Sequence, residues 1–203
     1  MSAASRPRPT PVSQHLGHRR ARPGRVRIIG GTHRGRLVDV PDAPGLRPTP
    51  DRVRETLFNW LGQDLTGAST FEPWAGCGVL TLEARSRGAA LCVAIDRDAV
   101  VIRALRATAL RLGLDAIDAR PGDALAALAA ETRRFDVIFA DPPFADDPWS
   151  RFLPLAAARL APQGRIYAEA GHPIDVPPPL QLVRQARAGG VHYHLLAAAA
   201  QRP

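Results

Sequence analysis

The segment Asp141-Pro142-Pro143-Phe144 carries the clearest chemical signal in the sequence. Two consecutive prolines fix the backbone, so that the Asp141 carboxylate and a carbonyl oxygen can point into one site. Both would accept hydrogen bonds from a planar exocyclic amine, while Phe144 offers a ring face to a flat base. Holding the N–H groups of such an amine favours a pyramidal nitrogen whose lone pair faces an electrophile. The alternative is a proline-stiffened loop whose aromatic ring packs inward.

A second segment, Ala75-Gly76-Cys77-Gly78, would let the backbone approach a ligand closely just before a helix. Thr81 stands where a dinucleotide fingerprint needs its third glycine, and no phosphate-binding Gly-Lys-Ser/Thr motif is present. Glu72 would repel a pyrophosphate but would accept hydrogen bonds from an ammonium group. We therefore expect S-adenosylmethionine, a positively charged ligand with ribose and adenine, rather than NAD. An ordinary strand-to-helix turn is the alternative.

Strand and helix patterns alternate from Thr70 onward, which predicts a mainly parallel sheet with helices on both faces. In an open parallel sheet, ligands bind outside the carboxyl ends of the strands. The expected strands are 70–72, 91–95, a weak one at 116–119, and 135–140. The segments that follow them are Glu72 to Gly78, Asp96, Gly122-Asp123, and Asp141 to Phe144. We expect these segments to line one crevice.

Further elements flank this alternating region. Residues 25–41 read as a small N-terminal β-hairpin, and Thr49 is expected to cap a helix that has Pro50 at its first position. A helix capped by Asp98 should end at Gly113. A strand is expected at 165–168, and strands at 180–185 and 191–197, separated by Gly189-Gly190, predict an antiparallel C-terminal hairpin. The expected class is therefore α/β, with a Rossmann-like sheet.

The positive charge is concentrated near the N-terminus. All 27 basic residues are arginine, and nine of them precede the first acidic residue, Asp39. Residues 1–24 lack periodic apolar positions, so we interpret them as a disordered basic arm. Arginines displace counterions from phosphates, which favours a nucleic-acid partner. A solubilising tail with arginine in place of lysine is the alternative.

The composition excludes several classes of protein. Hydrophobic residues make up 45% and charged residues 23%, as in globular proteins rather than in disordered chains, collagens or coiled coils. No apolar run reaches membrane-spanning length, and no signal peptide is visible. Cys77 and Cys92 fit free thiols of a cytoplasmic protein, and neither the cysteines nor the six histidines have metal-binding spacing. Nothing in the sequence demands more than a monomer.

Colinear motifs between about residues 25 and 170 resemble the bacterial 16S ribosomal RNA (guanine-N2) methyltransferases of the RsmD type. The Asp141 to Phe144 segment matches the [DN]PP[FYW] motif of amino-methyltransferases, and Ala75-Gly76 matches their cofactor loop. The more specific matches are Arg27 to Gly31, Arg34-Gly35-Arg36, Leu46 to Thr49, Asp51 to Asn59, Leu82-Glu83-Ala84 and Ser86 to Ala89.

The resemblance implies a class I, S-adenosylmethionine-dependent enzyme that methylates N2 of one guanine in 16S rRNA. The partner would be the small ribosomal subunit or an assembly intermediate. The implied regions are the arm 1–24, an RNA-contacting hairpin extension 25–48, and a methyltransferase domain 49–203. Methyl transfer would be direct, without a covalent enzyme intermediate, onto a base swung out of its stack.

The resemblance also implies roles for individual residues. Asp141, Pro142, Pro143 and Phe144 would hold the guanine. The implied cofactor-binding residues are Thr49, Arg54, Glu72, Ala75, Gly76, Gly78, Asp96 and Asp123. The implied RNA-binding residues are Arg27, Arg34, Arg36, Arg47 and Arg52. The family carries an acid at the position of Ala94, and Asp96, two residues further along the strand, is expected to replace it.

Two alternatives stay open. The first is an amino-methyltransferase with another target, such as adenine N6 in DNA or a different rRNA site, because adenine and guanine both offer a conjugated amine. The second is a noncatalytic RNA-binding assembly protein that keeps the fold.

Overall fold

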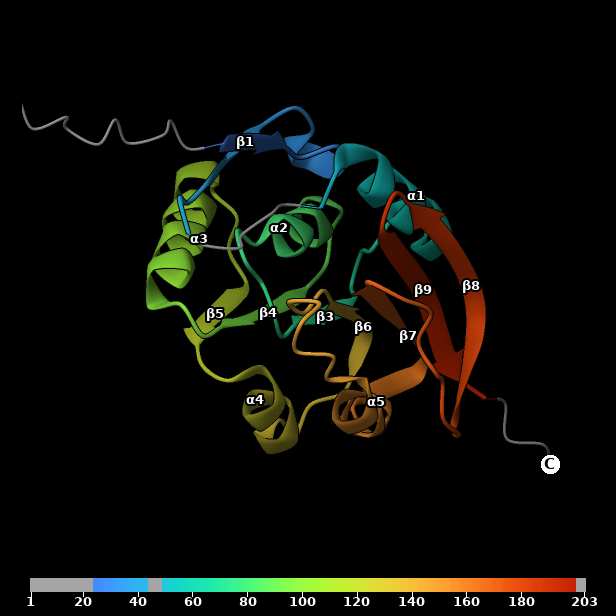
Figure 1. Cartoon of the computed structure of the whole chain (residues 1–203). Coiled ribbons are helices and arrows are strands. Elements are labelled where there is room, and N and C mark those ends of the chain that lie inside the picture. The colour runs from blue at the N-terminus through green and yellow to red at the C-terminus, as the bar shows by residue number, and fades with distance from the viewer. Residues whose placement is uncertain (1–23, 44–48, 200–203) are drawn as a thin grey trace, which may run out of the picture.

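A seven-stranded sheet forms the centre of the computed structural model, which describes residues 24–43 and 49–199 (Figure 1). The strand order is β5-β4-β3-β6-β7-β9-β8. The bounds are β3 (Ser69–Glu72), β4 (Leu91–Asp96), β5 (Ile117–Pro121), β6 (Phe135–Ala140), β7 (Leu160–Ala170), β8 (Leu180–Ala188) and β9 (Val191–Ala198). The expected basic arm, apart from Gly24, and the predicted RNA contact Arg47 lie outside the described residues.

The pairing within the sheet confirms the predicted class. Strands β3 to β7 run parallel to one another, whereas β9 is antiparallel to both β7 and β8. The apolar run that predicted strand 135–140 forms β6 with the same bounds, between β3 and β7. The carboxyl ends of β3, β4, β5, β6 and β7 therefore meet at one edge, where ligands bind in sheets of this kind.

Helices cover both faces of the sheet. Figure 1 shows α1 (Asp51–Leu61), α2 (Val79–Ser86) and α3 (Ala99–Leu112) on one face, and α4 (Ala124–Ala130) and α5 (Trp149–Ala158) on the other. Leu57 and Phe58 of α1 pack with Tyr167 on the first face. On the second face, Leu128 and Phe152 pack against Ile138. Each helix thus buries its apolar side on the sheet, as an amphipathic helix must.

The ends of α1 and α3 test the helix caps that were predicted from the sequence. The Asp98 carboxylate accepts a hydrogen bond from Val100 N at 2.7 Å, and Gly113 ends α3 with φ of 68°, so both predicted ends are confirmed. The predicted Thr49 cap of α1 is wrong, because Pro50 occupies the cap position and no side chain caps the helix. Thr49 is buried instead, and its hydroxyl is hydrogen-bonded to Glu169.

The N-terminal segment forms the predicted hairpin. Strands β1 (Gly24–Arg27) and β2 (Leu37–Val40) pair antiparallel, and a short 3-10 turn lies between them at Gly31–His33. Ile28 and Val38 are fully buried against α2 and α3. The hairpin therefore forms an extra layer on the outer side of these helices (Figure 1).

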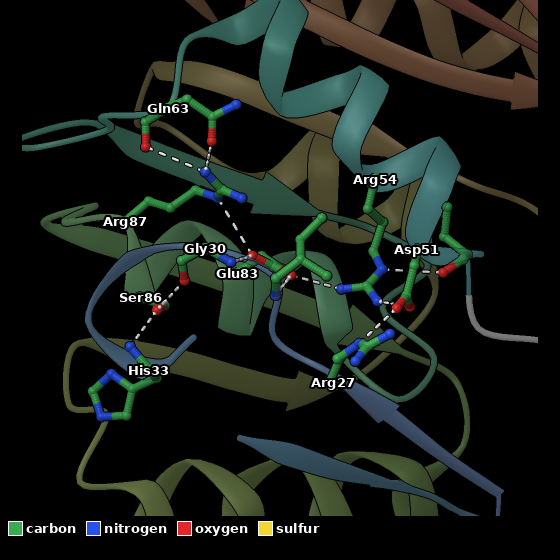
Figure 2. A network of polar contacts seen from close by, with 11 residues as sticks. Arg27, Gly30, His33, Asp51, Arg54, Gln63, Glu83, Ser86 and Arg87 are labelled. Carbon is green, nitrogen blue, oxygen red and sulfur yellow. Dashed lines mark hydrogen bonds and ion pairs between the residues drawn. The ribbon is translucent and has the colours of Figure 1, made fainter. Parts of the chain in front are cut away.

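A buried carboxylate fastens this layer to the rest of the molecule (Figure 2). Glu83 of α2 accepts hydrogen bonds from the backbone N–H groups of Ile29, at 2.5 Å, and Gly30, at 3.3 Å. It also binds Arg54 of α1 at 2.6 Å and Arg87 at 3.3 Å. Burial raises the pKa of Glu83 and lowers that of Arg87, so each charge needs its partners.

A second set of bonds fixes the turn of the hairpin. The Ser86 hydroxyl donates to the Gly30 carbonyl at 2.7 Å and accepts from His33 N at 2.9 Å. Gly31 has φ of 72°, and a Cβ there would lie 1.9 Å from the Ser86 carbonyl oxygen. Only glycine allows this approach of hairpin to helix.

Glu83→Gln is predicted to destabilise the protein by about 3–5 kcal/mol, because it leaves two buried guanidinium groups without their shared charge. Urea unfolding, followed by circular dichroism, measures the change. Glu55→Gln on the exposed side of α1 is the matched control and is expected to change the unfolding free energy by less than about 0.5 kcal/mol. Equal midpoints for the two variants would contradict this role of Glu83.

Candidate functional site

Three carboxyl groups meet at the ends of adjacent strands. Glu72 ends β3, Asp141 follows β6, and Glu169 lies next to the last residue of β7. Because these strands are neighbours in the sheet, the three groups are close enough for Glu169 and Glu72 to raise the pKa of Asp141 electrostatically. The carboxyl edge of the sheet, where the sequence predicts a crevice, thus carries three acidic groups close together.

Glu72, at the end of β3, is buried. Its carboxylate accepts hydrogen bonds from Thr81 N, at 3.0 Å, and from the Thr81 hydroxyl. These bonds favour the charged form, but burial outweighs them and raises the pKa of Glu72 to about 8. A cationic group beside Glu72 would stabilise the ionised carboxylate and lower that pKa.

Asp141 and Glu169 interact with one another. Burial and the negative charge of Glu169 raise the pKa of Asp141 well above its usual value. Burial also raises the pKa of Glu169, against the effect of hydrogen bonds from the Tyr167 hydroxyl, at 2.8 Å, and from Thr49. Two buried carboxyl groups that repel each other hold a proton between them more readily than either would alone. A ligand that donates hydrogen bonds to both groups would favour their ionised forms and lower both pKa values.

The glycine loop is held by Asp96 at the end of β4. Its carboxylate accepts from Gly76 N at 2.8 Å and from Asp98 N at 2.9 Å. Asp96 itself is partly exposed, whereas Ala94 on the same side of the strand is completely buried. The acid that can reach a ligand from this strand is therefore Asp96.

The other predicted residues of the glycine loop allow the loop to pack closely against its neighbours. Gly76 and Gly78 have φ of 51° and 72°, and a Cβ at Gly78 would lie 2.3 Å from the Leu105 side chain. Ala75 is buried, and its N–H donates to the Ile95 carbonyl at 2.8 Å. The loop therefore lies tightly between β4 and α3, which brings its backbone to the edge of the crevice.

Asp123 lies at the next position along the same edge. It caps α4 by accepting from Ala126 N at 2.9 Å, and its side chain is exposed. The neighbouring Gly122 N donates to the Asp96 carbonyl at 2.9 Å. This bond joins the end of β4 to the loop that follows β5, so Asp96 and Asp123 lie at neighbouring strand ends.

Phe144 supplies an accessible aromatic face. Its side chain is 44% exposed, and its ring packs so close to Gly171 that a Cβ there would lie 3.4 Å from the Phe144 Cδ2 atom. Pro142 is buried and Pro143 is exposed. With Phe144 they line a narrow recess whose other wall includes Glu169 and Trp149. A flat ring stacked on Phe144 would thus lie beside carboxyl groups.

Two predicted cofactor contacts, Thr49 and Arg54, are buried. Arg54 is completely buried, and its guanidinium nitrogens donate to the Thr49 carbonyl at 3.1 Å, to Glu83 at 2.6 Å and to Asp51 at 2.6 Å. Thr49 in turn bonds to Glu169. Arg54 is therefore part of the Glu83 network (Figure 2), and its bond to the Thr49 carbonyl links this network to the segment that reaches Glu169.

Sequence reasoning missed Glu169 and Tyr167. The expected strand 165–168 stops one residue before Glu169, whereas β7 continues to Ala170. Asp141 was predicted because it is an acid at the carboxyl end of a parallel strand. Glu169 has the same position in β7, so a predicted strand that reached residue 170 would have indicated it as well.

The predicted RNA-binding arginines lie in two places. Arg27 is 65% exposed and pairs with Asp51 at 3.0 Å beside the exposed Arg52, near the start of α1. Arg34 and Arg36 are exposed at the turn of the hairpin. The described arginines therefore do not form one patch around the crevice.

The described residues contain no helix that could cross a membrane and no group of three or more His, Cys, Asp or Glu arranged to hold a metal ion. Cys77 and Cys92 are free and buried, and burial raises the pKa of each thiol to about 11. Such thiols are poor nucleophiles at neutral pH.

Comparison with known proteins gives a consistent family. Residues 26–197 match the family model described as conserved hypothetical protein 95. Ribosomal RNA small subunit methyltransferase D of Escherichia coli is 40% identical over 184 residues, which cover 88% of this chain and 92% of that protein.

Solved structures agree with this relationship. A methyltransferase structure from Escherichia coli has 38% identity and a TM-score of 0.79, covering 88% of this chain and all of that one. An RNA methyltransferase from Salinibacter ruber, in complex with S-adenosyl-L-homocysteine, has 20% identity and a TM-score of 0.58, so that likeness concerns the fold. Because the family model spans residues 26–197 and methyltransferase D of Escherichia coli is 40% identical over most of both chains, the chain belongs to the ribosomal RNA small subunit methyltransferase D family.

Proposed function

We propose that the protein transfers a methyl group from S-adenosylmethionine to the exocyclic N2 of one guanine in the 16S rRNA of the small ribosomal subunit. The observation that carries this proposal is the trio Glu72, Asp141 and Glu169 beside the exposed face of Phe144. Membership of the methyltransferase D family supports the substrate class.

The residues of the crevice fit S-adenosylmethionine, which supplies a methyl group on a cationic sulfur. The ammonium group of the ligand suits the buried Glu72 carboxyl, whose raised pKa reports that it lacks a counter-charge. Asp96 would accept hydrogen bonds from ribose hydroxyls, and Asp123 would accept one from the adenine amine. The close packing of Gly78 against Leu105 holds the backbone of this loop at the carboxyl edge of the sheet, where it would line the bound ligand.

The Asp141–Glu169 pair favours guanine over adenine. Guanine presents its N1–H and N2–H groups side by side as donors, whereas adenine presents an acceptor nitrogen beside its N6 amine. Asp141 would accept from N2–H while Glu169 accepts from N1–H, and Phe144 would stack on the ring. The proton that leaves N2 on methylation would pass to this carboxyl pair.

Asp141→Ala is predicted to lower the rate of methyl transfer at least about 100-fold, because the amine loses the acceptor that orients it. The assay is transfer of tritiated methyl from S-adenosylmethionine to small subunits that lack the modification, to naked 16S rRNA and to duplex DNA, with nucleoside analysis of the product. Asp146→Ala in the same loop, an exposed residue that pairs with Arg97, is the matched control.

The products separate the alternatives. N2-methylguanosine formed by the wild type and lost in Asp141→Ala supports the proposal. N6-methyladenine in DNA would replace it with the other amino-methyltransferase function. RNA binding without transfer to any substrate would indicate a noncatalytic assembly protein.

Binding of S-adenosylmethionine is predicted to strengthen between pH 6 and pH 8. Glu72 has a pKa of about 8, so at lower pH it must release a proton before it can pair with the ligand's ammonium group. The dissociation constant should fall by up to about tenfold per pH unit below that pKa. Calorimetry in buffers of different ionisation enthalpy measures both the affinity and the proton released.

Glu72→Gln is expected to weaken binding and to remove the proton release that the Glu72 carboxyl contributes. Glu55→Gln is the control and should keep the wild-type pH profile. A wild-type affinity independent of pH, or a Glu72→Gln variant with the full proton release, would show that Glu72 does not face the ammonium group.

A further inference from the structure

The turn of the hairpin lies at the edge of the sheet opposite the crevice. Helices α2 and α3 each begin at the carboxyl end of a strand and return to the start of the next one, so their last turns mark the amino-terminal edge. His33 bonds to both last turns: its backbone N–H donates to the Ser86 hydroxyl, and its Nε2 donates to the Leu112 carbonyl at 3.0 Å.

The position of the hairpin turn determines how far it lies from the crevice. Helix α3 has 14 residues, which corresponds to a length of about 21 Å. The turn is therefore about 20 Å from the crevice, where α3 begins. Arg34 and Arg36, although predicted to bind RNA, lie too far away to contact the target base.

The turn and the last turn of α3 enclose a cavity of about 460 Å³. We call it the hairpin–α3 recess, and its lining residues are His33, Gly35, Arg36, Leu37, Arg111 and Leu112. The Arg111 guanidinium donates to the Leu37 carbonyl at 3.1 Å, so the two walls are directly connected.

The charge of the recess is positive. Arg111 lies 3.6 Å from Asp39, but that carboxylate is shared with Arg25 at 3.2 Å. Within residues 24–43 and 49–199, neither Arg34 nor Arg36 has an acidic partner at ion-pair distance, and both are exposed. Of these two, Arg36 lines the recess, and an unpaired arginine at a concave surface is typical of phosphate recognition.

The recess is also held rigidly with respect to the crevice. Glu83 binds the backbone of Ile29 and Gly30 and, through Arg54, the segment at Thr49 that contacts Glu169. The close approach of Gly31 to Ser86 fixes the turn itself. An RNA that contacts both the recess and the crevice must therefore span a fixed distance between them.

We propose that the hairpin–α3 recess binds a backbone phosphate of the rRNA substrate about 20 Å from the target base. This inference rests on the proposed function. It implies that the enzyme selects a folded RNA that is wide enough to reach both edges of the sheet. It also implies that Arg36 and Arg111 contribute to RNA affinity without acting on the methyl transfer step.

The test compares Arg36→Ala, Arg111→Ala and the double variant with Arg36→Lys. Arg134→Ala, an exposed arginine directly before β6 at the same edge, is the matched control. Binding of 16S rRNA is measured across salt concentrations, and methylation is measured at varied RNA with saturating S-adenosylmethionine. Thermal unfolding verifies that each variant is folded.

The double variant is expected to lower kcat/KM for RNA on the order of tenfold, with kcat and the affinity for S-adenosylmethionine unchanged. The slope of log affinity against log salt should fall by about one to two units. Arg36→Lys should keep most of the wild-type affinity, because a single positive charge still meets the phosphate.

An unchanged salt slope, or an equal loss in Arg134→Ala, would overturn the recess as an RNA site. Competition by inorganic phosphate distinguishes a site for free phosphate: recess variants that lose phosphate binding but keep RNA affinity would also overturn it. If the wild type methylates no RNA, the proposed function fails, whereas the salt slopes still decide whether the recess contacts RNA.

Discussion

The buried carboxylate of Glu83 is the constraint on which the rest of the structure depends. It lies on a helix of the central layer, and it binds backbone amides of the hairpin, a guanidinium of α1 and the guanidinium of Arg87, which also stacks on Phe58 with 4.1 Å to the ring centroid. Because two buried cations and one buried anion are stable only together, these elements can dock in one arrangement. The distance between hairpin and crevice follows from that arrangement.

The acidic crevice has the opposite character. Its carboxyl groups accept hydrogen bonds from Thr81 and Tyr167, but no arginine or histidine of the described residues forms an ion pair with them. Burial raises the pKa values of Glu72, Asp141 and Glu169 because it penalises their ionised forms, and the charges of Glu169 and Glu72 add to this effect at Asp141. A folded protein keeps such a cluster where a ligand compensates for it. Under the proposed function, a cationic cofactor and a base rich in hydrogen-bond donors would both relieve this penalty.

Local patterns were sufficient wherever a short stretch of chain decides its own conformation. The apolar run 135–140 predicted β6, the Asp98 and Gly113 signals predicted both ends of α3, and the paired β-strands after residue 180 predicted the C-terminal hairpin. Strand β7 is longer than the predicted strand 165–168. It begins at Leu160 and passes through Gln163, whose φ is 65°, before it pairs regularly from Arg165. That irregularity breaks the alternation on which strand prediction rests.

The sequence by itself determined the sheet, its carboxyl-edge segments and the residue types of the crevice, because apolar periodicity and turn residues act over a few positions. Only the tertiary structure decided that Arg54 is buried in the Glu83 network, that Glu169 joins Asp141, and that the hairpin turn reaches the far edge. These outcomes depend on contacts such as Thr49 with Glu169 and His33 with Leu112, between residues far apart in the chain. No local pattern encodes which distant partner a buried polar group will bind, because that choice is made by the packing of the whole fold.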